Sequence, residues 1–285
     1  MFLLRLLSYL PFWILYRVSD FLFLVSYYVV RYRRKVVIEN LRRSFPEKTE
    51  SEIEVITKKF YKSLCDYGVE TLKLLTISKE DLKVRMVYKN PEILQKHADS
   101  NQSVLLLASH QFNWEWLLAA GSFYLPMSID FVYQEQNNKG FNQFSLACRT
   151  RFGAHAIQRR NVAREAIRRR NIVRSTAIVA DQFPSAHYDK RFWTVFLNQE
   201  TAFFQGISQL ATLMQAPVYY AAIRKLKRGY YTIELIPLAM PPYEKESYEM
   251  VEAYVRETER LIRQHPSDWL WSHKRWKKTK DQMGD

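Results

Sequence analysis

A histidine and a carboxylate stand five residues apart where an apolar run of the sequence ends. Residues 109–115 read Ser-His-Gln-Phe-Asn-Trp-Glu and follow the apolar stretch SVLLLAS at 103–109. A carboxylate bonded to one imidazole nitrogen fixes the tautomer and leaves the other nitrogen free to take a proton from an alcohol. The sequence therefore predicts His110 as a general base and Glu115 as the acid that orients it, with no nucleophile supplied by the protein.

The elements on either side could bring these two side chains together. The apolar run predicts a buried strand, and residues 114–123 predict a helix with Asn113 as N-cap and Glu115 in its first turn. On one continuous helix a separation of five would splay the side chains apart, but His110 in the preceding turn could meet Glu115. The alternative is a histidine satisfied by local hydrogen bonds beside a glutamate that only caps the helix.

The rest of the chain alternates helical and strand patterns. Such alternation predicts an α/β fold, an αβα sandwich around a mixed sheet, formed by residues 36–285, with its site beyond the carboxyl ends of the strands. The patterns indicate helices over 51–75, 114–123, 137–152, 162–170, 202–215 and 247–264, and strands over 103–109, 129–133, 176–180, 218–223 and 230–236. The last two strands are expected to form a hairpin around Arg228-Gly229.

The first 35 residues predict a membrane-associated helical segment with a basic flank. Its longest apolar runs are Leu6–Tyr16 and Phe21–Val30, followed by RYRRK at 31–35. A spanning helix needs about 20 apolar residues, so the segment could span the membrane or lie in its interface. Arg17 and Asp20 could pair on one helical face. If the segment spans, the basic flank places the rest of the chain in the cytoplasm. The alternative is a buried helix of a soluble protein.

The charge balance indicates an anionic partner. The 285 residues carry 43 Lys and Arg against 29 Asp and Glu, a net charge of +14. Nucleic acid, anionic lipid or an acidic protein would satisfy this excess, and the arginines of 158–174 could serve any of them. No nucleic-acid motif is present, so we expect no nucleic-acid partner.

Other chemistries lack their motifs. The two cysteines form no C-x-x-C pair and the histidines have no ligand spacing, so no metal site is expected. There is no glycine-rich phosphate loop and no G-x-S-x-G motif, which argues against a nucleotide cofactor and a serine hydrolase. Ser109 is interpreted as a turn residue, and Trp269 and Trp271 as core.

Several blocks together resemble the late lipid A biosynthesis acyltransferases (lauroyl and myristoyl transferases), which share the H-x-x-x-x-D/E signature of glycerolipid acyltransferases. The blocks are His110 to Glu115 with Asn113-Trp114-Glu115, Val132-Tyr133 with Asn137, Arg151-Phe152-Gly153 with Ile157, Asp181-Gln182, Phe196 to Gln199 with Thr201 and Gly206, and Pro266, Trp269, Trp271, His273, Arg275 and Trp276. Phe112 and Asn198 stand where the family often has Gly, and Phe112 could reshape the acceptor side of the pocket.

The resemblance implies transfer of a fatty acyl chain from an acyl carrier protein thioester to a hydroxyl of a lipid A precursor. The reaction would take place on the cytoplasmic side of the inner membrane, without a cofactor or a covalent enzyme intermediate. His110 and Glu115 would be catalytic, and Asn113, Arg151, Asp181 and Gln182 would bind or position substrate, with Arg151 or helix N-terminal amides at the oxyanion or a phosphate. The alternatives are acylation of another lipid, such as a lysophospholipid or aminolipid, and a non-catalytic basic membrane-binding protein.

Overall fold

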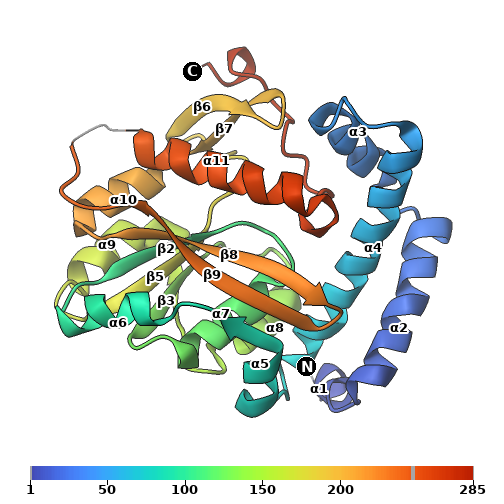
Figure 1. The fold of residues 1–285 in the computed structure, drawn as a ribbon, viewed down its shortest axis with the longest axis horizontal. Coiled ribbons are helices and arrows are strands. Elements are labelled where there is room, and N and C mark those ends of the chain that lie inside the picture. The colour runs from blue at the N-terminus through green and yellow to red at the C-terminus, as the bar shows by residue number, and fades with distance from the viewer. Residues whose placement is uncertain (1, 245–247, 285) are drawn as a thin grey trace.

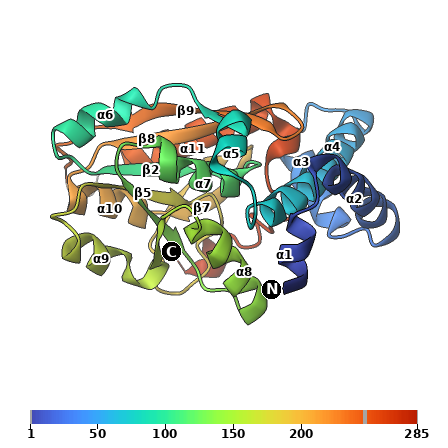
Figure 2. The same ribbon diagram turned by 90° about the horizontal axis from the view of Figure 1, so that it is seen from below.

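The computed structural model describes residues 2–244 and 248–284, which fold around a seven-stranded mixed sheet with helices on both sides (Figures 1 and 2). The predicted αβα sandwich is confirmed. The strand order is β1-β9-β8-β2-β5-β3-β4. The strands are β1 (Met86–Tyr88), β2 (Val104–Ala108), β3 (Ser128–Tyr133), β4 (His155–Gln158), β5 (Arg174–Val179), β8 (Val218–Lys227) and β9 (Tyr230–Ala239), and a separate hairpin is formed by β6 (Arg191–Phe196) and β7 (Gln199–Phe204).

The helices form two groups, one around α7 and one around α10, and a third set in which α1, α2 and α3 pack on α4. Helix α7 contacts α5 and α8, whereas α10 contacts α9 and α11. The helices are α1 (Phe2–Ser8), α2 (Phe12–Leu24, continued by a π-helical turn Val25–Val29), α3 (Arg34–Ser44), α4 (Glu50–Lys73), α5 (Lys79–Arg85), α6 (Glu92–Asp99), α7 (Trp114–Tyr124), α8 (Lys139–Thr150), α9 (Val162–Arg168), α10 (Gly206–Met214) and α11 (Glu249–Gln264).

Strand β2 lies at the centre of the sheet. All five of its residues are buried, as expected for a strand covered on both faces. It pairs in parallel with β5 on one side and β8 on the other, and β3 and β4 continue the parallel set beyond β5. The carboxyl ends of β2, β3, β4 and β5 therefore meet at one edge, where an α/β sheet places its site.

Helix α4 stands beside that edge of the sheet (Figure 1). A capping box starts it, in which the Thr49 side chain accepts from the Glu52 amide and the Glu52 carboxylate accepts from the Thr49 amide. At the end of β8, the Lys225 Nζ lies 3.7 Å from a carboxylate oxygen of Asp66 on α4. The sequence predicts this helix at 51–75, close to its observed bounds.

Helix α2 packs along α4 (Figure 1). Together, α2 and its π-helical turn, Phe12–Val29, are long and apolar enough to cross a membrane by length and composition. The suggested Arg17–Asp20 pair is wrong. Asp20 instead accepts from the guanidinium of Arg228 at 2.8 Å, while Arg17 is exposed. The β8–β9 turn brings Arg228 within reach, a long-range contact that local spacing could not reveal.

The predicted helix over 202–215 is wrong at its start, because residues 199–204 form β7. Strands β6 and β7 are joined by Leu197 and Asn198, whose φ angles are 50° and 64°. Two-residue hairpin turns favour positive φ at both positions, which suits Gly and Asn. Asn198 therefore replaces the glycine common in the family at a position that tolerates it. Ser247, where the sequence predicts the last helix to begin, lies outside the described residues.

Substitution in the central strand β2 tests how much the buried core contributes to the free energy of unfolding. Leu107 in β2 is 0% exposed, so Leu107→Ala should lower the free energy of unfolding by about 2–5 kcal/mol through lost burial and the cavity left behind. Leu226→Ala is the control, since Leu226 is 67% exposed and its loss should change the value by less than about 0.5 kcal/mol. Urea denaturation of both variants in the same detergent measures the difference, and equal effects would contradict the assigned core.

Candidate active site

His110 occupies the turn between β2 and α7, and the C-terminal segment holds this turn in place. The His110 carbonyl accepts from the Leu270 amide at 3.1 Å, and the Phe112 amide donates to the Asp268 carbonyl at 2.9 Å. Gln111 and Trp269 form an isolated antiparallel bridge between the same two segments. The turn is thus held by backbone bonds to residues more than a hundred positions away in sequence.

The carboxylate that holds the His110 ring is Asp181. Its Oδ1 lies 2.6 Å from the His110 Nδ1, while its Oδ2 accepts from the His110 amide at 2.9 Å and from the Trp269 indole at 2.6 Å. Burial alone would raise the pKa of Asp181, but the charge and hydrogen bonds of His110 and the Trp269 bond outweigh it, so this pKa lies below its usual range. Asp181 therefore stays ionised and can fix the imidazole tautomer.

The predicted pairing of Glu115 with His110 is wrong. Both Glu115 oxygens accept instead from Arg149, at 2.8 Å from Nε and 2.6 Å from Nη2. Glu115 sits in the first turn of α7 as predicted, but there its side chain points to α8, while Asp181 follows β5, the strand beside β2. The orienting acid thus comes from the neighbouring strand end rather than from the adjoining helix.

Glu115 is linked to His110 through Trp114. The Trp114 indole donates to Glu115 Oε1 at 3.1 Å, and its ring meets the His110 ring edge-on, with centroids 4.9 Å apart. Tyr67 of α4 packs against Trp114 with the two rings tilted by 33° and their centroids 4.1 Å apart. Burial disfavours the charge of Arg149, yet Glu115 keeps the pKa of this guanidinium above its usual range. The Glu115–Arg149 ion pair therefore fixes the aromatic wall beside the imidazole.

Asn113 caps α7, as the sequence predicts. Its side-chain oxygen accepts from the amides of Glu115 and Trp116, both at 3.1 Å, and its nitrogen donates to Glu70 Oε2 at 3.0 Å. Asn113 is fully buried with its side-chain atoms engaged in these bonds. The structure therefore gives this residue a structural part in place of the predicted contact with substrate.

Gln182 is the predicted residue that faces the reactive nitrogen. Its Nε2 lies 3.3 Å from the His110 Nε2, the nitrogen that Asp181 leaves free. Arg151 lies elsewhere, at the end of α8, where it donates to the carbonyls of Leu74 and Ile77 at 2.8 and 2.5 Å. These bonds engage Arg151 with the segment after α4, so the predicted oxyanion contact has no support in the structure.

The residues that could serve as protein nucleophiles are poorly suited to that role. Ser109 is buried, accepts from the Tyr220 hydroxyl at 2.8 Å and bonds the Gln111 side chain at 3.3 Å. Burial raises the pKa of Cys148 to about 12, so it stays a neutral thiol. An imidazole held by an acid beside such groups suits activation of a hydroxyl that the substrate brings.

Within residues 2–244 and 248–284, no group of three His, Cys, Asp or Glu side chains could hold a metal ion.

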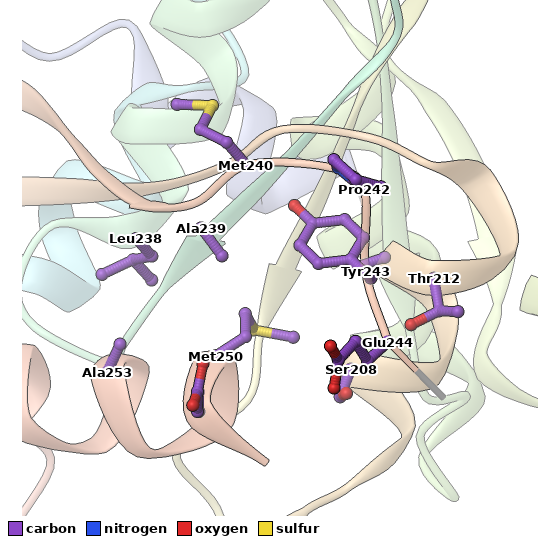
Figure 3. Close-up of a pocket in the computed structure, with 12 residues that line it drawn as sticks. Ser208, Thr212, Leu238, Ala239, Met240, Pro242, Tyr243, Glu244, Met250 and Ala253 are labelled. Atoms are coloured by element: carbon purple, nitrogen blue, oxygen red, sulfur yellow. The ribbon is translucent and has the colours of Figure 1, made fainter. Parts of the chain in front are cut away.

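A cavity of about 540 Å³ lies between α10, β9 and α11 (Figure 3). It is lined by Leu238 and Ala239 near the end of β9. Because β9 runs antiparallel to β8, which is parallel to β2, this cavity lies at the opposite edge of the sheet from His110.

Three residues near the site were missed or given another role by the sequence. Arg149 belongs to no motif, and its part in the site is seen only from its ion pair with Glu115. Trp269 is buried as expected for a core residue, but it also binds Asp181. His273 accepts from the Phe183 amide at 3.5 Å, next to Gln182. The signal that could have found the Asp181 pair was its position after a strand, since adjacent parallel strands end together.

The fold and site define an α/β enzyme in which an acid-held imidazole can activate a hydroxyl. Over residues 1–278 the sequence matches the family described as bacterial lipid A biosynthesis acyltransferase. It is similar to lipid A biosynthesis acyltransferase 2 of Shigella flexneri, at 24% identity over 262 residues, which cover 89% of this chain and 80% of that protein. Because the family match spans nearly the whole chain, the protein belongs to this family and is an acyltransferase.

The partly buried His273 predicts an acid-sensitive fold. Burial, reinforced by the charge of Arg275, lowers the pKa of His273 to about 4. Between the ordinary value of about 6.5 and about 4, the unfolded chain binds a proton that the folded chain does not, so stability falls as pH falls through this window. His273→Gln should show a smaller loss of unfolding free energy between about pH 7 and about pH 5, measured by urea denaturation.

The control for this test is His187→Gln, because His187 is exposed. It should retain the pH dependence of the unchanged protein. Identical pH dependence in His273→Gln and in the unchanged protein would contradict the lowered pKa of His273 in the folded state.

Proposed function

We propose that the protein transfers a fatty acyl chain from an acyl carrier protein thioester to a hydroxyl of a lipid A precursor, with His110 as general base. The observation that carries this proposal is the bond between His110 Nδ1 and the buried Asp181, which leaves Nε2 free. The family match supports the lipid acceptor. We further propose that the acylation is secondary, so that the acceptor already carries acyl chains.

The chemistry needs no covalent enzyme intermediate. The acceptor hydroxyl displaces Gln182 from His110 Nε2 and gives its proton to that nitrogen as its oxygen attacks the thioester carbonyl carbon. Asp181 stabilises the imidazolium that forms. The tetrahedral intermediate then collapses, the carbon–sulfur bond breaks, and the proton on Nε2 passes to the leaving thiolate. Gln182 is a candidate donor to the developing oxyanion once displaced.

Charge supports an acidic carrier protein as donor. Arg160 and Arg164 are exposed and follow the carboxyl end of β4, at the same edge of the sheet as His110. Cationic side chains near a site speed encounters with an acidic partner. The exposed apolar residues of α1 and α2 support association with the inner membrane. The basic residues 31–35 that follow them favour the cytoplasmic side for the catalytic residues.

Substitution of the dyad tests the mechanism. His110→Asn removes the base and should lower kcat by about 10²–10⁴-fold, and Asp181→Asn should lower kcat by about 10²-fold or more because the tautomer is no longer fixed. Transfer of labelled acyl groups from the carrier protein measures both. Glu115→Gln should have a smaller effect on kcat, since Glu115 acts through Trp114.

His187→Asn is the matched control, because the same change at an exposed histidine leaves the site intact. All variants should retain the circular dichroism spectrum of the unchanged protein. Full transfer activity in a folded His110→Asn protein would refute the general base, and a larger loss in Glu115→Gln than in Asp181→Asn would reverse the assignment of the orienting acid.

The acceptor is tested in cells. Removing the protein should remove one secondary acyl chain from lipid A in the mass spectrum of total lipids, and the unchanged protein should restore it, whereas His110→Asn should not. If lipid A is unchanged and a lysophospholipid or aminolipid accumulates instead, the acceptor is that lipid and the proposed lipid A acceptor is wrong.

A further inference from the structure

Helices α1 and α2 expose an apolar surface. Six large apolar residues on them and on the following π-helical turn are each at least 58% exposed; we call these residues the outer face, and they are Phe2, Leu3, Leu6, Trp13, Phe21 and Val29. Large apolar groups gathered on one surface mark a membrane or protein contact. Such a surface could belong to a helix that spans a bilayer or to one that lies in its interface.

The opposite side of α2 is polar and bound to the catalytic part of the chain. The Tyr16 hydroxyl donates to Glu70 Oε1 at 3.0 Å, and the Ser19 hydroxyl donates to Asp66 Oδ1 at 2.7 Å. Arg228 joins the Asp66 carboxylate to that of Asp20, at 2.6 and 2.8 Å. These bonds lie in the middle of the apolar segment, where a spanning helix would face hydrocarbon.

The contact with α4 extends from one end of the segment to the other. At the first end, the Lys73 Nζ donates to the carbonyls of Ser8 and Leu10 at 3.0 and 2.9 Å. At the other end, the Ser26 hydroxyl lies 3.6 Å from the Cys65 Sγ. Helices α2 and α4 thus run side by side in opposite directions over the whole apolar segment (Figure 1).

This packing is incompatible with a span. Helix α4 carries Lys58, Lys59 and Lys62 in exposed positions, and the Lys62 Nζ lies 6.0 Å from the centre of the Phe23 ring of α2. If α2 crossed the bilayer, these ammonium groups would enter the hydrocarbon together with the Asp66–Arg228 pair, which is costly. An amphipathic helix that lies in the interface avoids this cost, because only its apolar face is buried in lipid.

The basic residues complete a surface suited to anionic headgroups. The basic segment 31–35 meets the start of the basic segment 273–280 where the Arg33 guanidinium donates to the Ser272 carbonyl at 3.0 Å. Around this contact Arg31, Lys35, Lys274 and Lys277 are exposed. Such clusters attract anionic lipids.

We propose that α1 and α2 lie in the plane of one leaflet, with the outer face toward the acyl chains and the basic residues toward anionic headgroups, so that the segment does not cross the bilayer. The chain is then bound to one side of the membrane, and both of its ends are on the side of the catalytic residues. This proposal rests on the membrane association proposed above and decides its geometry.

Topology is tested on the full chain with an epitope tag at each terminus. In inverted inner-membrane vesicles an added protease should remove both tags, and in intact spheroplasts it should remove neither. Removal of the C-terminal tag alone in inverted vesicles would place the N-terminus across the membrane and overturn the proposal. Failure of the chain to sediment with membranes would overturn it as well.

The outer face is tested by vesicle co-sedimentation. Trp13→Ser combined with Phe21→Ser should weaken binding to phosphatidylglycerol vesicles by about tenfold or more, because two large apolar groups no longer enter the lipid. The control is Val195→Ser combined with Leu213→Ser, which removes exposed apolar residues elsewhere. Equal binding by both double variants, or equal binding of the unchanged protein to phosphatidylcholine vesicles, would contradict the assigned surface.

Neither readout depends on acyl transfer. An inactive protein with both tags on one side would refute the proposed reaction and leave the topology standing. An active protein with its N-terminal tag on the far side would refute the topology alone.

Discussion

The site depends on one short hydrogen bond between the ends of two adjacent strands. β2 and β5 pair in parallel and end together, so His110 and Asp181 emerge side by side although 71 positions separate them. Asp181 also accepts from the His110 amide and from the Trp269 indole, which makes it the point where two strands and the C-terminal segment join. Because this carboxylate is buried and ionised, it holds the imidazole in one tautomer.

The sequence could predict the frame of the molecule but not this pairing. The strand before His110, the N-cap at Asn113 and the αβα sandwich follow from local apolar patterns and capping chemistry, which act over a few residues. The choice between Glu115 and Asp181 depends on strand order and on Arg149 of α8, which draws Glu115 away. The helix predicted at 202–215 includes the last three residues of β7, because the pairing of β7 with β6 through the turn at Leu197 and Asn198 is a contact that a local apolar pattern does not reveal.

Tertiary contacts also explain how the apolar N-terminal segment and the basic segments are arranged. The stretch Phe12–Val29 is long and apolar enough to cross a membrane, yet Tyr16, Ser19 and Asp20 are bonded to α4 and to the β8–β9 turn. The basic groups at 31–35 and 273–280 come together through Arg33 and Ser272. Composition therefore indicates a lipid partner, and the pairing of the polar side chains indicates how the segment meets it.

Glu70 connects helix α2 to the turn that carries His110. Its two carboxylate oxygens accept from Tyr16 of α2, from Asn113 at the start of α7 and from Tyr231 of β9. With α2 in the leaflet as proposed, this shared carboxylate sets the height of the His110 imidazole above the acyl chains. The enzyme would then select an acceptor by the depth at which its hydroxyl lies in the bilayer, a geometric filter that operates before any contact with the sugar or headgroup.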